Sequence, residues 1–142
     1  MVSLAGEHVY LDANTVIYAI EGYAKYSNLQ AGLLIPLDAG VFTGITSEIT
    51  LVETIVGPRK TGDTLTESDY RAFLTPSANL QIEPITLPIL EKVIELRAQH
   101  GLKIPDAIHL ATGMLARCTV YVTRDASWVK TGVTVVEPQD IA

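Results

Sequence analysis

The sequence is poor in cysteine and in charge, and each shortage excludes a class of protein. Cys118 is the single cysteine among 142 residues, so the chain can form neither an internal disulfide nor a cysteine-rich metal site. Charged residues make up only 18% of the chain and hydrophobic residues 48%, which is typical of a globular protein and not of a disordered one. The length matches one domain, which we expect to span residues 1–142.

Long apolar runs are also missing. No apolar stretch approaches the roughly 18–20 residues that are needed to span a bilayer. The first residues, Met1 to His8, contain no basic segment that leads into an apolar one, so we expect no secretory signal. These features lead us to expect a cytoplasmic protein.

Positive charge is scarce, and several well-known motifs are absent. Ten Lys and Arg residues face sixteen Asp and Glu residues, which gives a net charge of −6 and argues against a tight general binder of nucleic acid. The chain has no Gly-x-Gly-x-x-Gly fingerprint, no Gly-Lys-Ser/Thr phosphate loop and no Gly-x-Ser-x-Gly elbow. Its three histidines are too scattered to suggest a zinc site.

What the sequence does contain is an alternation of short strand-like segments with helical ones. The strand-like segments are rich in β-branched or aromatic residues, and they are His8–Leu11, Val41–Ile45, Leu80–Glu83, Thr119–Val122 and Val133–Val136. The helical segments are Asn14–Ile20, Leu29–Leu37, Ser47–Val56 (which we expect to stop at Gly57-Pro58), Glu67–Leu74, Leu87–His100 and Pro105–Arg117. This order predicts an α/β fold, a three-layer α/β/α sandwich around a mainly parallel sheet.

Two aspartates directly follow predicted strands. Asp12 comes after Leu11, and Asp125 comes just past the segment that ends at Val122. Because active sites of parallel sheets lie beyond the carboxyl ends of the strands, the two carboxylates can meet at one rim. Each could equally be a turn residue, since Asp is favoured in turns for local hydrogen bonding.

Glu53 stands on or beside the apolar stripe of the helical segment Ser47–Val56. A buried charge without a partner is costly, so such a glutamate is normally paired or bound to a metal. Thr50 and Glu53 also fit a capping box. We discount the capping box, because the apolar periodicity predicts that the helix starts nearer Thr46 or Ser47.

Asp106 follows Pro105 in the first turn of a predicted helix. Acidic residues are common there because they complement the helix dipole, so this position alone favours a structural role. His109 lies one turn further on, and we assign it as a packed or hydrogen-bonded residue and not as a ligand.

The chain resembles the PIN-domain family, and in particular the VapC-like toxin ribonucleases of bacteria and archaea. Four segments in order carry the resemblance, and each supplies one acidic residue: 9–15, 46–53, 101–112 and 121–125. The resemblance implies that Asp12, Glu53, Asp106 and Asp125 are catalytic and hold Mg²⁺ or Mn²⁺ in one acidic pocket. It also implies that Asn14 or Thr15, together with Thr123, orient these carboxylates.

Two residues depart from the commonest pattern of the family. Arg124 occupies a position that is often Asn, and Gly113 replaces a better helix former at a cost of ~1 kcal/mol in an exposed helix interior. Lys103 and Arg124 are candidate contacts for RNA phosphates, and Arg59 and Lys60 are further candidates. All four could equally be solvated surface charges.

The resemblance implies an endoribonuclease that acts as the toxin of a type II toxin–antitoxin pair, with a small antitoxin as partner and a homodimeric assembly. An alternative is a PIN-like scaffold that binds a protein partner without catalysis. A third possibility is a haloacid-dehalogenase-like phosphatase, because Leu11–Thr15 resembles its Asp-x-Asp-x-Thr loop. Asn14 stands where that loop needs a second Asp, and the chain is short for that family.

Overall fold

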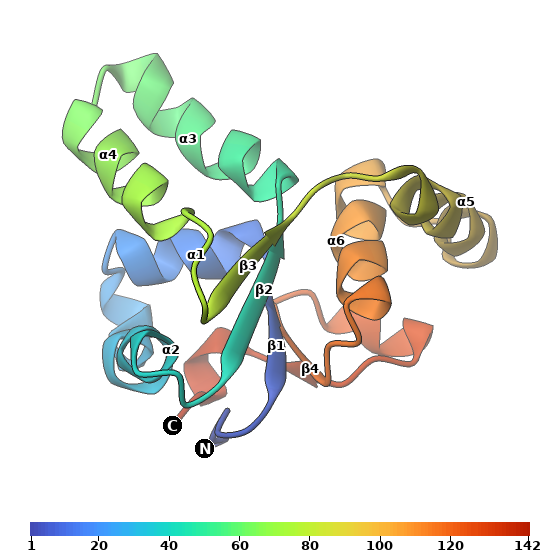
Figure 1. Ribbon diagram of the computed structural model, residues 1–142, viewed down its shortest axis with the longest axis horizontal. Helices are drawn as coiled ribbons and strands as arrows, with labels where there is room; N and C mark the ends of the chain where they lie inside the picture. Colours follow the sequence, from blue (N-terminus) through green and yellow to red (C-terminus); the bar gives the residue numbers. More distant parts are fainter.

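Five parallel strands form the central sheet of the computed structural model, which describes residues 1–142 (Figure 1). The strands are β1 (His8–Leu11), β2 (Thr43–Ser47), β3 (Leu80–Glu83), β4 (Val120–Val122) and β5 (Val135–Val136). Their order across the sheet is β3-β2-β1-β4-β5, and every neighbouring pair is parallel. The predicted α/β fold is confirmed, and its sheet is wholly parallel.

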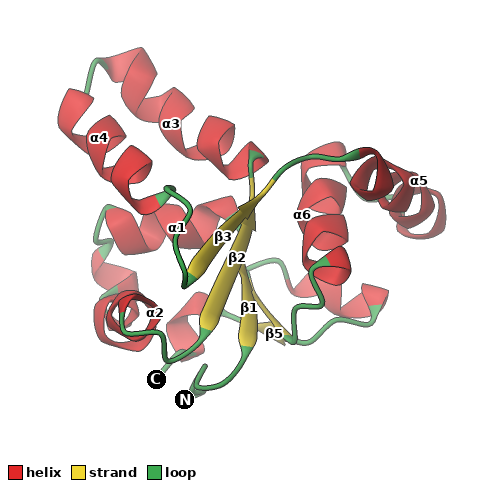
Figure 2. Ribbon diagram, viewed as in Figure 1, coloured by secondary structure: helices red, strands yellow, loops and turns green.

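Helices cover both faces of this sheet, which gives the three predicted layers (Figure 2). On one side lie α1 (Ala13–Ile20), α2 (Ile35–Asp38), α3 (Ile49–Thr61) and α4 (Thr64–Phe73); on the other lie α5 (Leu87–His100) and α6 (Ile104–Leu115). Shorter turns of helix are η1 (Ala24–Tyr26), η2 (Gln30–Leu34), η3 (Ala126–Thr131) and η4 (Pro138–Asp140). None of these helices combines the length and the apolar character needed to cross a membrane.

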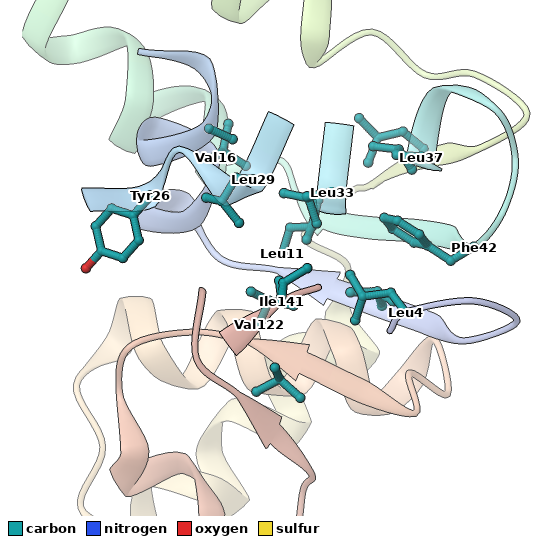
Figure 3. Close-up of a cluster of buried hydrophobic side chains, with 14 of the residues drawn as sticks. Leu4, Leu11, Val16, Tyr26, Leu29, Leu33, Leu37, Phe42, Val122 and Ile141 are labelled. Carbon is teal, nitrogen blue, oxygen red and sulfur yellow. The ribbon is translucent and has the colours of Figure 1, made fainter. Parts of the chain in front are cut away.

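Alternate residues of β1 pack into two separate hydrophobic cores, one on each face of the sheet. Val9 and Leu11 pack into the core beneath α1, where Figure 3 shows Leu11 close to Leu33 and Ile141. Tyr10 faces the opposite core, which α5, α6 and η3 close. Strands that are buried on both faces carry continuous apolar runs, and burying each large side chain stabilises the fold by about 1.5–3 kcal/mol.

The position of β1 between β2 and β4 determines what meets at the edge of the sheet. Leu11 pairs with Val122, so the residues that follow, Asp12 and Thr123, leave the sheet side by side. Asp125 lies just beyond Thr123 and therefore at the same edge. This confirms that Asp12 and Asp125 share one edge of a parallel sheet.

The predicted helix end at Gly57-Pro58 is wrong. α3 continues through Pro58 to Thr61 and ends at Gly62, whose φ of 73° is left-handed. A proline ring normally pushes the preceding residue out of the helical region by clashing with its Cβ. Gly57 has no Cβ, which allows the backbone to stay helical before Pro58.

Other boundaries shift by a few residues. β2 begins and ends two residues later than predicted, so α3 starts at Ile49 and not near Thr46. The predicted helix Leu29–Leu37 is a π-helical turn followed by α2, with Pro36 in the first turn of α2. α4 begins earlier than predicted, because Asp63 caps it by accepting a hydrogen bond from the Thr66 amide at 3.1 Å.

Gly113 is not in an exposed helix interior, as the sequence analysis assumed, but is buried where α6 crosses β4. A Cβ at this position would lie 2.8 Å from Cζ and 2.9 Å from the hydroxyl oxygen of Tyr121, with another ring carbon nearer still. A real Cβ does not approach other atoms so closely. The close packing of the helix on the Tyr121 ring therefore requires glycine here, whatever its helix propensity.

Candidate active site

Asp12 is buried at the carboxyl end of β1 and caps α1. One carboxylate oxygen, Oδ1, accepts a hydrogen bond from the Thr15 amide at 2.8 Å, and Oδ2 accepts one from the Thr123 hydroxyl at 2.6 Å. The side chain is only 7% exposed. The sequence left a turn residue and a carboxylate at the sheet edge as alternatives for Asp12, and the structure shows local hydrogen bonding and the place at the edge in the same residue.

Thr123 joins Asp12 to Asp125. While its hydroxyl donates to Asp12, the same oxygen accepts a hydrogen bond from the Asp125 amide at 3.1 Å. The Asp125 carboxylate in turn accepts from the amide and hydroxyl of Ser127, at 3.0 and 2.5 Å, and caps η3. The hydroxyl of Thr15 donates to the Val122 carbonyl at 3.1 Å.

Thr15 and Thr123 therefore lie where residues that orient the carboxylates are expected. Asn14 does not, because its side chain is exposed and makes no hydrogen bond within the chain. Of the two alternatives for the first supporting position, only Thr15 contacts Asp12, and it does so through its backbone amide.

Glu53 projects from α3 and reaches α6. Its Oε1 lies 2.6 Å from Nε2 of His109, and the glutamate side chain is 34% exposed. The capping box is absent, because the hydroxyl of Thr50 instead pairs with that of Thr46 at 2.7 Å. The expectation that a glutamate on this face needs a partner is confirmed.

His109 is packed and hydrogen-bonded, as predicted, but the sequence analysis did not identify its partners. It is 3% exposed, and its second ring nitrogen, Nδ1, lies 2.5 Å from the hydroxyl oxygen of Tyr10 on β1. We assign the tautomer from these partners: the Tyr10 hydroxyl donates to Nδ1, so Nε2 carries the hydrogen and donates to Glu53. The centre of the Trp128 ring lies 6.3 Å from the centre of the imidazole ring, and the two ring planes are inclined at 30°. A packed, hydrogen-bonded histidine was predicted, but its partners lie 56 and 99 residues away in the chain.

Asp106 is half-buried in the first turn of α6, as predicted. Burial raises the pKa of its carboxyl group, and the negative charge of Asp125 raises it further. The charges of Glu53 and Asp12 add to this rise in pKa, while His109 opposes it. Asp12, Glu53 and Asp125 thus lie near enough to Asp106 for their charges to raise its pKa. We call Asp12, Glu53, Asp106 and Asp125 the acidic edge.

The donor chemistry of the acidic edge fits a hard divalent cation, since Mg²⁺ and Mn²⁺ prefer carboxylate oxygens. The side chains are not drawn together into a cage, because no three acidic, histidine or cysteine side chains are grouped closely enough to hold a metal ion. Mg²⁺ usually binds through one or two carboxylates and keeps several waters, so such a cage is not required for it.

The predicted cationic contacts divide into two groups. Lys103, which is exposed, directly precedes α6, and Arg124, which is also exposed, directly precedes Asp125. Arg59 instead pairs with Glu67 through two hydrogen bonds of 2.7 and 2.8 Å, and thereby ties α3 to α4. This pairing, helped by Arg71, lowers the pKa of Glu67 to about 2. The Arg59 guanidinium is therefore occupied within the fold, and Lys60 is exposed in the same last turn of α3.

The raised pKa of Asp106 predicts a pH-dependent effect of Asp106→Asn on the metal-free protein. A carboxyl group whose pKa is higher in the folded state destabilises the fold wherever it is ionised, and this cost disappears below its pKa in the unfolded state. Asp106→Asn should therefore raise the melting temperature at pH 7, and the gain should vanish as the pH falls below the usual carboxyl range.

The matched control is Asp69→Asn, which makes the same change at an exposed position of α4 and should alter stability by less than about 0.5 kcal/mol. Thermal melts of the three proteins across pH measure both effects. A gain for Asp106→Asn that persists at low pH, or a loss at pH 7, would contradict the shared electrostatics of the acidic edge.

The Tyr10–His109 contact predicts strong coupling between two substitutions. His109→Leu leaves the buried Tyr10 hydroxyl without a partner, which should cost about 1–3 kcal/mol of unfolding free energy. Tyr10→Phe removes that hydroxyl, so the double variant should lose less stability than the two single losses combined. Urea unfolding of the four proteins gives the coupling energy. Additive losses would show that the two groups are not hydrogen-bonded.

Many solved structures share this fold, among them three of toxin or toxin–antitoxin proteins. A chain of a toxin–antitoxin complex from Klebsiella pneumoniae is 29% identical, with a TM-score of 0.69, over 92% of this chain and 97% of that chain. VapBC2 from Rickettsia felis, bound to a DNA fragment from its promoter, matches at 22% identity and a TM-score of 0.68. The match covers 92% of this chain and 98% of that chain. VapC20 from Mycobacterium tuberculosis, a toxin that cleaves the sarcin–ricin loop, is 18% identical, with a TM-score of 0.66. The match covers 89% of this chain and 96% of that chain.

A search among curated proteins found no match. The sequence profile of the PIN domain, in contrast, matches residues 9–133, a range that contains all four residues of the acidic edge. With this match over most of its length and a fold shared with VapC-like toxins, the chain belongs to the PIN domain family.

Proposed function

We propose that this protein is a metal-dependent endoribonuclease that hydrolyses RNA phosphodiester bonds and serves as the toxin of a type II toxin–antitoxin pair. The observation that carries the proposal is the acidic edge. Asp12, Glu53, Asp106 and Asp125 come from four separate segments of a PIN-domain chain, and the charges of three of them act on the carboxyl group of the fourth. Such a gathering of like charges favours a cation as ligand.

Asp12, Glu53 and Asp106 would hold Mg²⁺ or Mn²⁺, and Asp125 would assist. A divalent cation bound there supplies a water of lowered pKa and offsets negative charge on phosphate oxygens. Without the four acids the chain would carry a net charge of −2, so most of its excess negative charge lies where a cation would be bound.

The residues around the acids hold them in place. The Thr15 amide and the Thr123 hydroxyl fix both oxygens of Asp12, and the Asp125 backbone is fixed through the same threonine. His109 engages Oε1 of Glu53 and leaves Oε2 without a partner in the chain. Hydrogen-bonded supports of this kind commonly orient metal ligands, and changing them typically costs 10–100-fold in affinity or activity.

A small antitoxin is the partner that we propose, and an apolar surface on α3 and α4 supports it. Val52 and Val56 are 66% and 47% exposed, and they line a hollow of about 310 Å³ with Leu51, Ile55 and two arginines. A larger hollow of about 520 Å³ lies between α2 and the end of α4. Apolar patches of this kind usually mark a protein-binding surface. The Klebsiella pneumoniae structure is itself a toxin–antitoxin complex.

A homodimer is the assembly that we propose, on the basis of the family resemblance. The outer face of α5 offers a second apolar stripe, because Leu87, Leu90 and Ile94 are 69%, 42% and 63% exposed. These residues follow helical spacing and are separate from the α3–α4 surface. A second copy can therefore bind there without competing with the antitoxin.

The cleavage assay that tests the proposed function uses a pool of structured and single-stranded RNAs. The purified protein should cut RNA with Mg²⁺ or Mn²⁺ and stop when a chelator is added. Asp12→Asn keeps an oxygen to cap α1 but removes a ligand charge, so its rate should fall by at least roughly 100-fold. Asp69→Asn on α4 is the control and should cut like the wild type.

Cleavage that resists the chelator would remove the metal mechanism. A protein that binds an antitoxin but cuts no RNA in any metal would instead be the non-catalytic scaffold.

A further inference from the structure

Three tyrosine side chains gather beside the acidic edge, and none of them belongs to the site predicted from the sequence. The rings of Tyr18 and Tyr26 are stacked, with centroids 4.2 Å apart and an angle of 13° between their planes. Tyr23 lies against Tyr18 at 5.4 Å, and the Lys25 ammonium group lies 5.5 Å from the centre of the Tyr26 ring. We call Tyr18, Tyr23 and Tyr26 the tyrosine platform.

Arg124 connects this platform to the acids. Its guanidinium donates a hydrogen bond of 3.4 Å to the Tyr18 hydroxyl. In the chain it stands between Thr123, which is hydrogen-bonded to Asp12, and Asp125. The platform therefore begins next to the residues that we propose to hold the cation.

The guanidinium of Arg124 keeps its positive charge available, because its hydrogen-bond partner is a neutral phenol. Several other cations of the chain are paired with carboxylates: Arg59 and Arg71 with Glu67, and Lys92 with Glu95. Glu137 is near enough for its charge to contribute to the raised pKa of Arg124, but no ion pair joins the two. An exposed arginine that has no carboxylate partner is suited to bind a phosphate group, because the planar guanidinium can donate two parallel hydrogen bonds to it.

The tyrosines differ in exposure in a way that suits a stacked ligand. Tyr26 is only 3% exposed and forms the base of the platform, whereas Tyr23 is 45% exposed and forms its rim. Figure 3 shows the Tyr26 hydroxyl pointing away from the surrounding aliphatic side chains. This buried hydroxyl has no hydrogen-bond partner in the chain.

We propose that the tyrosine platform and Arg124 bind an unpaired nucleotide of the substrate next to the phosphate that is cut. The base stacks on the exposed ring of Tyr23, and Arg124 binds the adjoining phosphate. This inference rests on the proposed function and assigns a base contact to Tyr23 and a phosphate contact to Arg124, outside the four acids. In a duplex the faces of the bases are already stacked, so they are not available to a tyrosine ring.

The platform also accounts for how an acidic protein can hold RNA. Contacts to phosphates weaken steeply with salt, and the chain carries only ten Lys and Arg residues against sixteen Asp and Glu residues. Stacking of a base on an aromatic ring contributes to affinity independently of net charge. Arg124 and the exposed ring of Tyr23 are therefore sufficient for selective binding of RNA with moderate affinity.

The test measures binding separately from cleavage. In the Asp106→Asn background, which should not cut, the affinity for a fluorescent single-stranded RNA and for its duplex is determined by anisotropy over a range of salt concentrations at constant Mg²⁺. The platform variants are Tyr23→Ala, Tyr23→Phe and Arg124→Gln. Arg117→Gln is the matched control, because it removes the same charge from an exposed residue just beyond the C-terminal end of α6, and that end of the helix is roughly 13 Å from Asp106 along its axis.

Tyr23→Ala should weaken binding of the single strand at least about fivefold and leave the salt dependence unchanged, while Tyr23→Phe should bind like the parent. Arg124→Gln should weaken binding and reduce the slope of log Kd against log salt by about 0.7, the value for one phosphate contact on a single strand. Arg117→Gln should change neither quantity. Equal binding of the duplex, parental binding by Tyr23→Ala, or no binding of either RNA would overturn the proposal.

Cleavage by the wild-type protein separates this proposal from the proposed function. If the wild type cuts RNA while the platform variants bind like the parent, the platform is wrong and the ribonuclease stands. If no RNA is cut but the single strand is bound through Tyr23 and Arg124 as described, the platform stands and the ribonuclease is wrong.

Discussion

The parallel pairing of β1 with β4, which brings acidic residues to one edge of the sheet, is the constraint on which the rest of this site depends. The parallel pairing of β1 with β4 sets Asp12 beside Thr123 and so places Asp125 nearby. α3 and α6 add Glu53 and Asp106. Because the sheet is buried on both faces, the strands cannot relax to separate these charges. An amide, a threonine hydroxyl and an imidazole hydrogen-bond to these carboxylates, and none of the three is a fixed positive charge.

The hydrogen-bonded row Tyr10–His109–Glu53 shows how the core supports the edge. Tyr10 belongs to β1 and points into the core opposite Leu11, so its hydroxyl can fix the ring of His109 from below. The ring then presents its other nitrogen to Glu53 on α3, a helix on the far side of the sheet from α5. A displacement of α6 against β1 would therefore move two of the four acids together. The close approach at Gly113, which seats α6 on Tyr121, limits such a displacement.

Much of the fold and the position of the acids could be predicted from the sequence, because the relevant signals are local. The bounds of β1, β3 and α5 are those that their patterns predict, and Asp12 and Asp125 follow strands whose parallel order fixes one edge. The partners of His109 could not be predicted, since they are distant in the chain and depend on how β1, α3 and α6 are placed relative to one another in the fold. Gly113 was misinterpreted for the same reason, because helix propensity says nothing of the ring above it.

The central claim, that the acidic edge is a cation site, is tested most directly by adding Mn²⁺ to isotopically labelled protein. The paramagnetic ion broadens the NMR signals of nearby amides, so it locates its own binding site. The account predicts broadening centred on Asp12, Glu53, Asp106 and Asp125, with Thr15 and Thr123 among the first amides affected. Broadening centred elsewhere, such as at Asp63 and Glu67 of the α3–α4 connection, or none at Mn²⁺ concentrations that support cleavage, would contradict it.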